Sequence, residues 1–370
     1  MHRLTSFAVP EGGPWRRSPP RPPHLRDESY LAKFDDCTVF YDVFRDPAGA
    51  HALAVGPPPL DLGPKMRQMS VRAAVAGPRL PFALLERPRL AHWRIRCGAK
   101  ARQLLISGLP AALPPLTIQP NHCDLFAGRR AIVTINKNND LLWVADWARF
   151  YRRAHGADAF LLYDNGSTLY SVDELRAAVA AAAGEARCAV VAWPFKFGPE
   201  GGPAGVWDSN FCQCGMLEHA RWRYLAAARS ILNVDIDELV MSPQRDSIFA
   251  ATERSALGFT AIASCWMTGL PPAARVPRFA DFQHRRRRLQ EVPKWCIDPR
   301  RCPPARQWLV HRVEGFDVPA APETEFLIRH YWSITTGWKP GRLNPTPADA
   351  AAHVRDDVAA AQLADYLAPE

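Results

Sequence analysis

The stretch SILNVDIDE, residues 230–238, decides the fold that the sequence predicts. Its first five residues form a largely apolar run that is typical of a buried strand, and Asp235, Asp237 and Glu238 follow directly. Two carboxylates that are two residues apart at the end of a strand can hold one divalent cation against a diphosphate. Because the same pattern also fits a solvated turn or a helix cap, its meaning depends on the sequence around it.

Strands and helices alternate in the segment before this stretch. Short apolar runs predict buried strands, and helical spacing of apolar residues between them predicts helices, the first ending at the C-terminal signal His155-Gly156. The predicted strands are 131–135, 159–163, 188–193 and 230–234, and the predicted helices are 141–155, 172–183 and 208–229. This alternation favours an α/β fold with a mostly parallel sheet, right-handed crossovers and helices on both faces.

Polar residues follow each predicted strand. In an open α/β sheet, ligands bind outside the carboxyl ends of the strands, so these residues should gather along one edge. Taken singly, each segment also fits an ordinary turn, since Gly166 accepts a positive φ and Asp164 can cap a turn. Four such segments at one edge favour a ligand site. They are 136–140, 164–167, 194–196 and 235–238.

The remaining sequence divides the chain into four parts. Residues 1–26 are rich in Pro and Arg, which predicts a disordered arm. Residues 27–127 contain short apolar runs separated by Gly and Pro, which predict a small β-rich accessory domain. The α/β domain covers residues 128–345. Residues 346–370 are predicted to form a C-terminal helix that starts at Thr346-Pro347.

The net charge of +9 is concentrated in two short segments. The arm carries five Arg and one Glu, and residues 284–288 contain four consecutive Arg, so the rest of the chain is nearly balanced. The sequence shows no basic stripe interleaved with aromatic residues and therefore gives no sign of nucleic-acid binding. We expect a solvated arm, with weak attraction to anionic lipid headgroups as the second interpretation.

The sequence also indicates a compartment. Residues 1–30 lack the apolar stretch of a secretory signal, and no segment reaches the ~18 apolar residues of a membrane span. The nine Cys do not have the spacing of a zinc site. These features predict a cytoplasmic protein with reduced thiols, with peripheral contact at the inner face of the membrane as an alternative.

Several nucleotide-binding and hydrolase motifs are missing from the sequence. It has neither G-x-G-x-x-G after the first strand nor G-x-x-x-x-G-K-[ST], and neither G-x-S-x-G nor H-E-x-x-H. Without a glycine-rich cradle, a bound diphosphate needs another source of positive charge. A cation on the paired aspartates would supply it.

Three segments of the α/β part contain motifs in a fixed order. The first segment, 138–170, contains LLWVADWARFY and GADAFLLYDNGST, the second, 213–240, contains DIDEL, and the third is 294–332. These segments resemble glycosyltransferase family 92 and the related family 2 enzymes of the GT-A fold. Together they span about residues 130–340. The resemblance implies a Rossmann-like GT-A fold and a hexosyltransferase-like, inverting transfer of sugar from a nucleotide-sugar donor to an acceptor hydroxyl. It also implies Mn²⁺ or Mg²⁺ dependence and a carbohydrate or glycoconjugate acceptor, as in polysaccharide biosynthesis.

The same resemblance implies roles for particular residues. Asp237 would ligate the metal, together with Asp235 and with His311 or His330, of which His311 is preferred because it ends the apolar run 308–310. Glu238 would orient Asp237 or a water from behind. The residues implied in nucleotide-sugar binding are Asn138, Asp140, Asp164, Asn165, Gln213, Asp235 and Lys294.

Two departures from the family pattern leave other functions open. The family's acidic residue in the Asn-Glu loop is Asn139 here, and no aspartate pair supplies an obvious general base. The candidates for the base are Glu314, Asp317 and Glu325. A catalytically degenerate carbohydrate- or nucleotide-binding scaffold is therefore the main alternative, and a nucleotidyltransferase is a third.

Tryptophans are frequent in the last third of the chain. Indole rings can stack on sugar rings, although core packing accounts for most buried Trp. Likewise, Arg285–Arg288 could grip a phosphate or lie in a solvated loop. The tryptophans are Trp266, Trp295, Trp308, Trp332 and Trp338.

Overall fold

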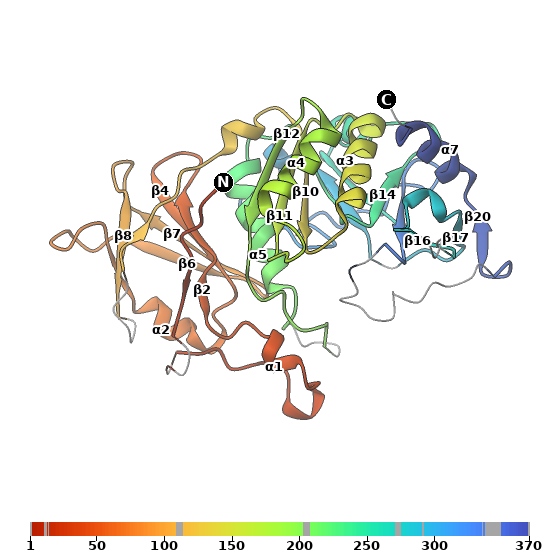
Figure 1. Ribbon diagram of the computed structural model, residues 1–370. Coiled ribbons are helices and arrows are strands. Elements are labelled where there is room, and N and C mark those ends of the chain that lie inside the picture. The colour runs from red at the N-terminus through yellow and green to blue at the C-terminus, as the bar shows by residue number, and fades with distance from the viewer. Residues whose placement is uncertain are drawn as a thin grey trace. The chain divides into compact units, whose positions relative to one another are not determined.

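The computed structural model describes residues 2–10, 13, 15–108, 114–202, 208–270, 275–290, 292–334, 336 and 349–368. The chain divides into two compact units, the first made of residues 1–124 and 193–226 and the second of residues 125–192 and 227–370. Together they give a mixed α/β architecture with several sheets (Figure 1). The segment 193–226, which the sequence analysis assigns to the α/β domain, belongs to the first unit.

The first unit consists mainly of short antiparallel strands. One sheet has the order β3-β4-β7-β6, another β5-β8-β9, and β1 pairs with β2. These strands are β1 (Phe7–Ala8), β2 (Thr38–Phe40), β3 (Asp42–Arg45), β4 (His51–Gly56), β5 (Ser70–Arg72), β6 (Phe82–Glu86), β7 (Ala91–Arg96), β8 (Gln103–Ser107) and β9 (Leu116–Thr117). The helical segments are η1 (Pro23–Leu25), α1 (Tyr30–Lys33), η2 (Leu60–Leu62), α2 (Gly63–Arg67), α5 (Phe211–Ala220) and the π-helical turn η4 (Arg221–Leu225). Along the sequence, η3 (Cys123–Phe126) spans the boundary between the two units.

The proline-rich N-terminal segment differs from the predicted solvated arm. Arg17 is buried, and its guanidinium donates to the carbonyl oxygens of Pro58 (2.7 Å) and Thr38. Arg21 is also buried and pairs with Asp208, with 2.8 Å between Nε and Oδ2. Both arginines bind groups inside the first unit and are not available to lipid headgroups, so they do not support a lipid-binding arm.

The second unit contains a six-stranded sheet of order β12-β11-β10-β13-β18-β15. The four strands predicted from apolar runs are parallel neighbours, as expected, whereas β18 and β15 add an antiparallel edge that the sequence analysis did not predict. The strands are β10 (Arg130–Asn136), β11 (Ala159–Asp164), β12 (Arg187–Ala192), β13 (Ser230–Asn233), β15 (Phe259–Ile262) and β18 (Lys294–Ile297).

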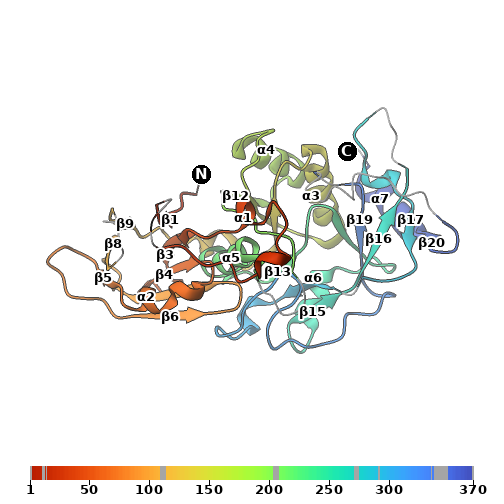
Figure 2. The same ribbon diagram turned by 90° about the horizontal axis from the view of Figure 1, so that it is seen from below.

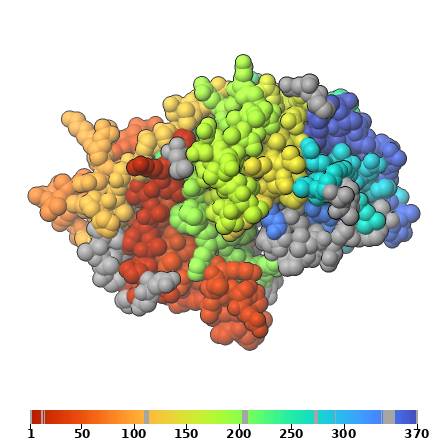
Figure 3. All heavy atoms as spheres, viewed as in Figure 1, coloured from red at the N-terminus to blue at the C-terminus, as the bar shows by residue number. Residues whose placement is uncertain are grey.

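Helices α3 (Leu141–His155) and α4 (Val172–Ala183) lie side by side on this sheet (Figure 1). Helix α3 ends at Gly156, whose φ of 68° places it in the left-handed region that glycine adopts easily. Helix α4 buries only Leu175, Val179 and Ala183, and Figure 3 shows its yellow-green residues at the surface. Helix α6 (Ile248–Arg254) contributes to the same hydrophobic core.

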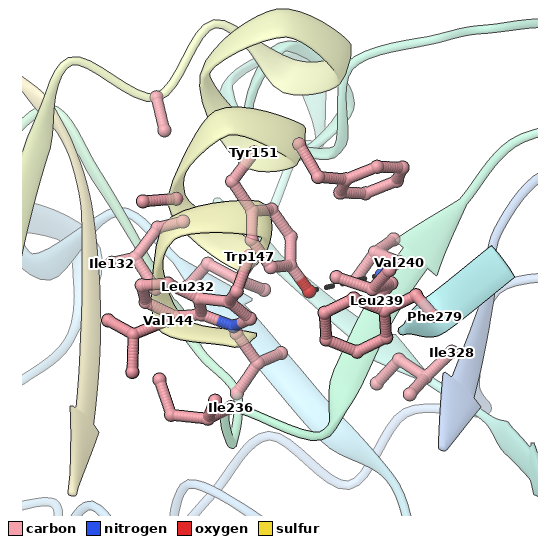
Figure 4. Close-up of a cluster of buried hydrophobic side chains, with 14 of the residues drawn as sticks. Ile132, Val144, Trp147, Tyr151, Leu232, Ile236, Leu239, Val240, Phe279 and Ile328 are labelled. Carbon is pink, nitrogen blue, oxygen red and sulfur yellow. Dashed lines mark hydrogen bonds between the residues drawn. The ribbon is translucent and has the colours of Figure 1, made fainter. Parts of the chain in front are cut away.

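That core connects the main sheet to the turn after β13. Leu232 and Ile236 lie among Val144 and Trp147 of α3, and the Tyr151 hydroxyl accepts a hydrogen bond from Val240 N at 3.0 Å (Figure 4). The buried Ile236 ties the acidic turn to the core. Burial of a side chain of this size stabilises the fold by about 1.5–3 kcal/mol.

A second sheet in the same unit has the order β14-β19-β16-β17-β20. Figure 2 shows β16, β17 and β19 side by side. Its strands are β14 (Glu238–Met241), β16 (Ser264–Thr268), β17 (His284–Arg286), β19 (Leu327–Tyr331) and β20 (His353–Arg355). The predicted arginine loop therefore begins within strand β17.

The remaining helical segments of the second unit are η5 (Phe279–Asp281), η6 (Pro299–Arg301) and α7 (Asp357–Tyr366). Helix α7 starts later than the predicted C-terminal helix, because Asp356 caps it and β20 precedes it. Thr346 and Pro347 lie outside the described residues. No helix in the described ranges is long and apolar enough to cross a bilayer.

Candidate functional site

The acidic turn between β13 and β14 is held rigidly by its backbone. Trp147 Nε1 donates to the carbonyl oxygen of Asp235 (3.1 Å), and Tyr331 N donates to that of Asp237 (2.8 Å). Ile236, which lies between the two aspartates in the sequence, is buried in the core (Figure 4). The side chain of Asp235 is 33% exposed and that of Asp237 is 14% exposed, so both can meet a ligand.

A buried lysine neutralises one side of this turn. Lys294, the first residue of β18, places Nζ 2.7 Å from Asp235 Oδ2 and 3.4 Å from Glu238 Oε2. Glu238 Oε2 also accepts a hydrogen bond from Asp235 N at 2.8 Å. Glu238 was expected to orient Asp237 or a water. Its carboxylate instead contacts the backbone of Asp235 and the ammonium of Lys294.

Burial and charge act on these groups in opposite directions. Burial opposes the ionisation of Asp235, but the adjacent Lys294 ammonium outweighs it and lowers the pKa of this carboxyl. Glu238 is more deeply enclosed, and burial raises its pKa despite the same lysine. Burial alone would lower the pKa of Lys294, yet Asp235 and Glu238 raise it. Lys294 is thus a fixed positive charge behind an ionised Asp235.

The second aspartate meets an imidazole from the other sheet. His330 of β19 is opposite Glu238 in the strand register, and its Nε2 lies 3.0 Å from Asp237 Oδ2. Its Nδ1 lies 3.2 Å from Gln290 Nε2 and 3.6 Å from Glu238 Oε1. The preferred candidate His311 instead has Nδ1 3.2 Å from the carbonyl oxygen of Pro293. His330 therefore lies beside Asp237, and His311 lies close enough to the turn for its charge to add to that of Lys294 in lowering the pKa of Asp235.

We tested this donor set against the divalent cation that the resemblance implies. Within the described ranges, no three or more His, Cys, Asp or Glu residues form a group that could hold a metal ion. A cation shared with a substrate diphosphate needs fewer protein ligands, because one or two carboxylates and the phosphates can suffice. Carboxylate suits Mg²⁺ and Mn²⁺, and imidazole suits transition metals. The pair Asp237–His330 fits such a shared cation, whereas Lys294 already occupies one oxygen of Asp235.

A second polar network follows β10 and β11 at the same end of the parallel strands. Asn136 and Asp164 are register partners, and Asn136 Nδ2 donates to Asp164 Oδ1 at 3.0 Å. Asn138, with φ at 55°, accepts from Thr168 N at 2.7 Å. Asp164 also caps its own turn by accepting from Ser167 N at 3.0 Å. These contacts order the loop that the resemblance implies in nucleotide binding.

Two other predicted nucleotide-binding residues have local structural roles. Asp140 caps α3 by accepting a hydrogen bond from Leu142 N at 2.8 Å. Asn165 is buried, and its backbone N donates to the carbonyl oxygen of Asn136 at 2.7 Å. Gln213 and the segment 194–196 belong to the first unit, whereas the acidic turn belongs to the second.

The three candidates for the general base differ in their surroundings. Glu314 Oε2 accepts a hydrogen bond from Gln307 N at 3.0 Å, which holds it in its own loop. Asp317 and Glu325 are exposed. None of these contacts points to one candidate over the others.

The sequence does not predict the residues that contact the acidic turn but lie far from it along the chain. The sequence places Trp147 in a predicted helix but does not show that its indole donates to Asp235. It gives no sign of Gln290, whose Nε2 lies 3.2 Å from His330 Nδ1. Gln290 follows the arginine run without any pattern that separates it from a loop residue. Its role depends on the pairing of strands far apart in the sequence, which no local spacing encodes.

Comparison with known proteins gives little further information. No protein-family model and no curated protein matches the chain. Two solved structures of LgtC align with part of it, one described as an active-site mutant and the other as a galactosyltransferase in complex with donor and acceptor sugar analogs. Each alignment covers 46% of this chain and 58% of the LgtC chain, with 19% sequence identity and a TM-score of 0.26. A TM-score this low does not assign an activity to this chain.

Proposed function

We propose that this chain is a glycosyltransferase that uses a nucleotide-sugar donor and a divalent cation. One observation carries the proposal: a partly exposed carboxylate pair at the end of a parallel strand is flanked by a buried lysine, 2.7 Å from Asp235, and by an imidazole, 3.0 Å from Asp237. This arrangement combines ligands for a cation with a fixed positive charge. Both are suited to a leaving diphosphate.

The proposed roles follow from the contacts of each side chain. Asp237 and His330 would hold the cation, which when bound would neutralise charge on the donor diphosphate. Lys294 keeps Asp235 ionised, so Asp235 can accept hydrogen bonds from the ribose hydroxyls through its remaining oxygen. The ordered loop of Asn138 and Asp164 would bind the nucleoside, as the resemblance to families 92 and 2 implies.

Isothermal titration with UDP, GDP and CDP, each with and without Mn²⁺, tests this proposal. We expect one of them to bind with a Kd at least tenfold lower when Mn²⁺ is present, and we expect Asp237→Asn to abolish that gain. The matching nucleotide sugars would then be screened for sugar transfer to a panel of oligosaccharides. Nucleotide affinity that is independent of Mn²⁺ and unaffected by Asp237→Asn would contradict the proposal.

The scaffold alternative has one observation in its favour. Asp235 and Asp237 already have a lysine and a histidine as partners within the protein, so the turn is stable without a metal. Such a protein would bind a nucleotide sugar with no turnover on any acceptor of the panel and no slow hydrolysis of the donor. Release of the nucleoside diphosphate from the donor would exclude it.

A further inference from the structure

A row of side chains crosses the second sheet next to the acidic turn. Glu238 of β14 pairs with His330 of β19, and His330 pairs with Trp266 of β16. Strand β17 runs antiparallel to β16 with Met267 opposite Arg285, which puts Arg286 beside Trp266. Cross-strand neighbours point to the same face of a sheet. The row therefore leads from the turn, through an imidazole and an indole, to a guanidinium.

Ring contacts show that these side chains form a continuous surface. The rings of Trp266 and His330 have centroids 3.9 Å apart at 32°, and Trp332 meets Trp266 edge-on at 4.8 Å and 76°. The Arg286 guanidinium carbon lies 5.3 Å from the centre of the Trp332 ring. The imidazole in this stack is the one beside Asp237.

These two indoles differ from other tryptophans of the same unit. Trp295 and Trp308 are completely buried and belong to the interior of the protein. Trp266 and Trp332 are half-buried, although large aromatic side chains on a sheet face usually gain most from full burial. An aromatic surface left partly open beside a proposed sugar-transfer site is suited to stacking against a pyranose ring.

Arg286 differs from the arginine next to it. Arg285 lies 3.7 Å from a carboxylate oxygen of Glu323 and 3.7 Å from one of Asp356. Within the described part of the chain, Arg286 has no carboxylate within ion-pair distance, and its guanidinium lies against the Trp332 ring. A half-buried guanidinium beside an indole offers its donors to an anion that comes from outside.

We propose that Trp266, Trp332 and Arg286 form the acceptor subsite, and that the acceptor sugar carries an anionic group, a carboxylate or a phosphate. This inference rests on the proposed glycosyltransferase function. Strands β19 and β17 are two strand spacings apart, about 10 Å, and the two indoles cover the surface between His330 and Arg286. The ring would stack on the indoles and the anion would bind Arg286.

Ligand-observed NMR titrations of the full chain, with Mn²⁺ and whichever of UDP, GDP and CDP binds, test the subsite. The probes are methyl β-D-glucuronide, glucose 6-phosphate and the neutral methyl β-D-glucoside. We expect at least one anionic probe to bind about tenfold more tightly than the neutral one, because a hydrogen bond to a charged group contributes this much. The probe that gains affinity distinguishes carboxylate from phosphate.

Two arginine variants provide the matched comparison. Arg286→Gln should reduce the affinity for the anionic probe to that for the neutral glucoside, whereas Arg287→Gln, one residue along the same run, should keep the full preference. Trp332→Leu should weaken all three probes together. Equal affinity of the wild type for the three probes, or a preference that survives in Arg286→Gln, would overturn the inference.

Nucleotide binding in the same samples separates this inference from the proposed function. If Mn²⁺-dependent nucleotide binding is intact while the anion preference is absent, only the acceptor assignment fails. If none of UDP, GDP and CDP binds in the presence of Mn²⁺, both fail.

Discussion

Each of the two units contains a cluster of carboxylate, imidazole and cation, but the two clusters differ in their access to solvent. In the first unit, the closed cluster consists of Asp42, His219 and Arg223, all three with side chains 0% exposed. Asp42 Oδ2 lies 3.0 Å from His219 Nε2 and 2.7 Å from Arg223 Nη1, and its other oxygen accepts from Thr5 N at 2.7 Å. Its hydrogen-bonding capacity is largely used inside the protein.

The open cluster in the second unit consists of Asp235, Asp237, Glu238, Lys294 and His330. Its cation and its glutamate are as deeply buried as those of a structural ion pair, at 2% and 3% exposure, but Asp235 keeps a third of its side chain in solvent. The comparison shows that buried charge alone does not mark a site. A ligand-binding site also needs a carboxylate oxygen that solvent can reach next to the buried charges.

Breaking the closed cluster should have the largest effect on stability. Arg223→Met leaves the charge of Asp42 buried without its strongest partner, and removing one member of a buried pair costs about 3–5 kcal/mol. Urea denaturation should show this loss in the free energy of unfolding. The double variant Asp42→Asn/Arg223→Met should recover part of it. A loss below about 1 kcal/mol would mean that the cluster is not closed to water.

The pH dependence of stability should reveal one buried neutral histidine in each unit, and the one in the first unit belongs to the closed cluster. Burial lowers the pKa of His219 to about 4 despite Asp42 beside it, and burial lowers the pKa of His155 in the second unit to about 4. Both rings are neutral in the folded protein and take up a proton more readily when unfolded. Stability is therefore complete above pH 6.5 and falls as the pH drops towards 4, by about 3 kcal/mol per histidine.

Urea denaturation at a series of pH values measures this slope. His155→Gln should remove about half of the decrease in unfolding free energy that the two histidines cause between pH 6.5 and 4. The reason is that His155 Nδ1 accepts a hydrogen bond from Ile248 N and loses it when the ring is protonated. The exposed His24→Gln variant is the control and should keep the wild-type slope. A slope that His155→Gln leaves unchanged would show that this ring is not held neutral.

A smaller loss of stability is expected when the open cluster loses its cation. Lys294→Met removes the charged partner of Glu238, which keeps its hydrogen bond from Asp235 N, and the loss costs about 1–3 kcal/mol, while the Asp235 side chain can turn to solvent. The Mn²⁺-dependent affinity for a nucleoside diphosphate should fall in the same variant, because Asp235 is no longer held in place. A variant that is destabilised as strongly as Arg223→Met would show that the open cluster is structural.

Much of the main sheet could be predicted because its signals are local. The apolar run at 131–135 became β10 (Arg130–Asn136), and His155-Gly156 marked the end of α3. The acidic turn was also found locally, since an apolar strand followed by D-x-D-E is visible within nine residues. Hydrophobic period and capping chemistry are properties of short segments, so the sequence contains them directly.

The remaining parts depend on contacts between distant segments. His330 reaches Asp237 only because β19 pairs with β14, across 93 residues, and no spacing distinguishes His330 from His311. The N-terminal segment was predicted to be solvated from its composition, yet Arg21 finds Asp208 across 187 residues. The assignment of 193–226 to the first unit likewise depends on tertiary packing that helical periodicity does not record.

The most direct test of the open cluster is an electron paramagnetic resonance titration of Mn²⁺ in the presence of UDP or whichever nucleoside diphosphate binds. The wild type and the exposed His24→Gln variant should bind one Mn²⁺ per chain with similar affinity, whereas Asp237→Asn and His330→Gln should each lose at least tenfold. Circular dichroism would verify that the variants are folded. If Asp237→Asn binds Mn²⁺ as tightly as the wild type, the carboxylate pair at the end of β13 is not a metal–diphosphate site, and the central claim is wrong.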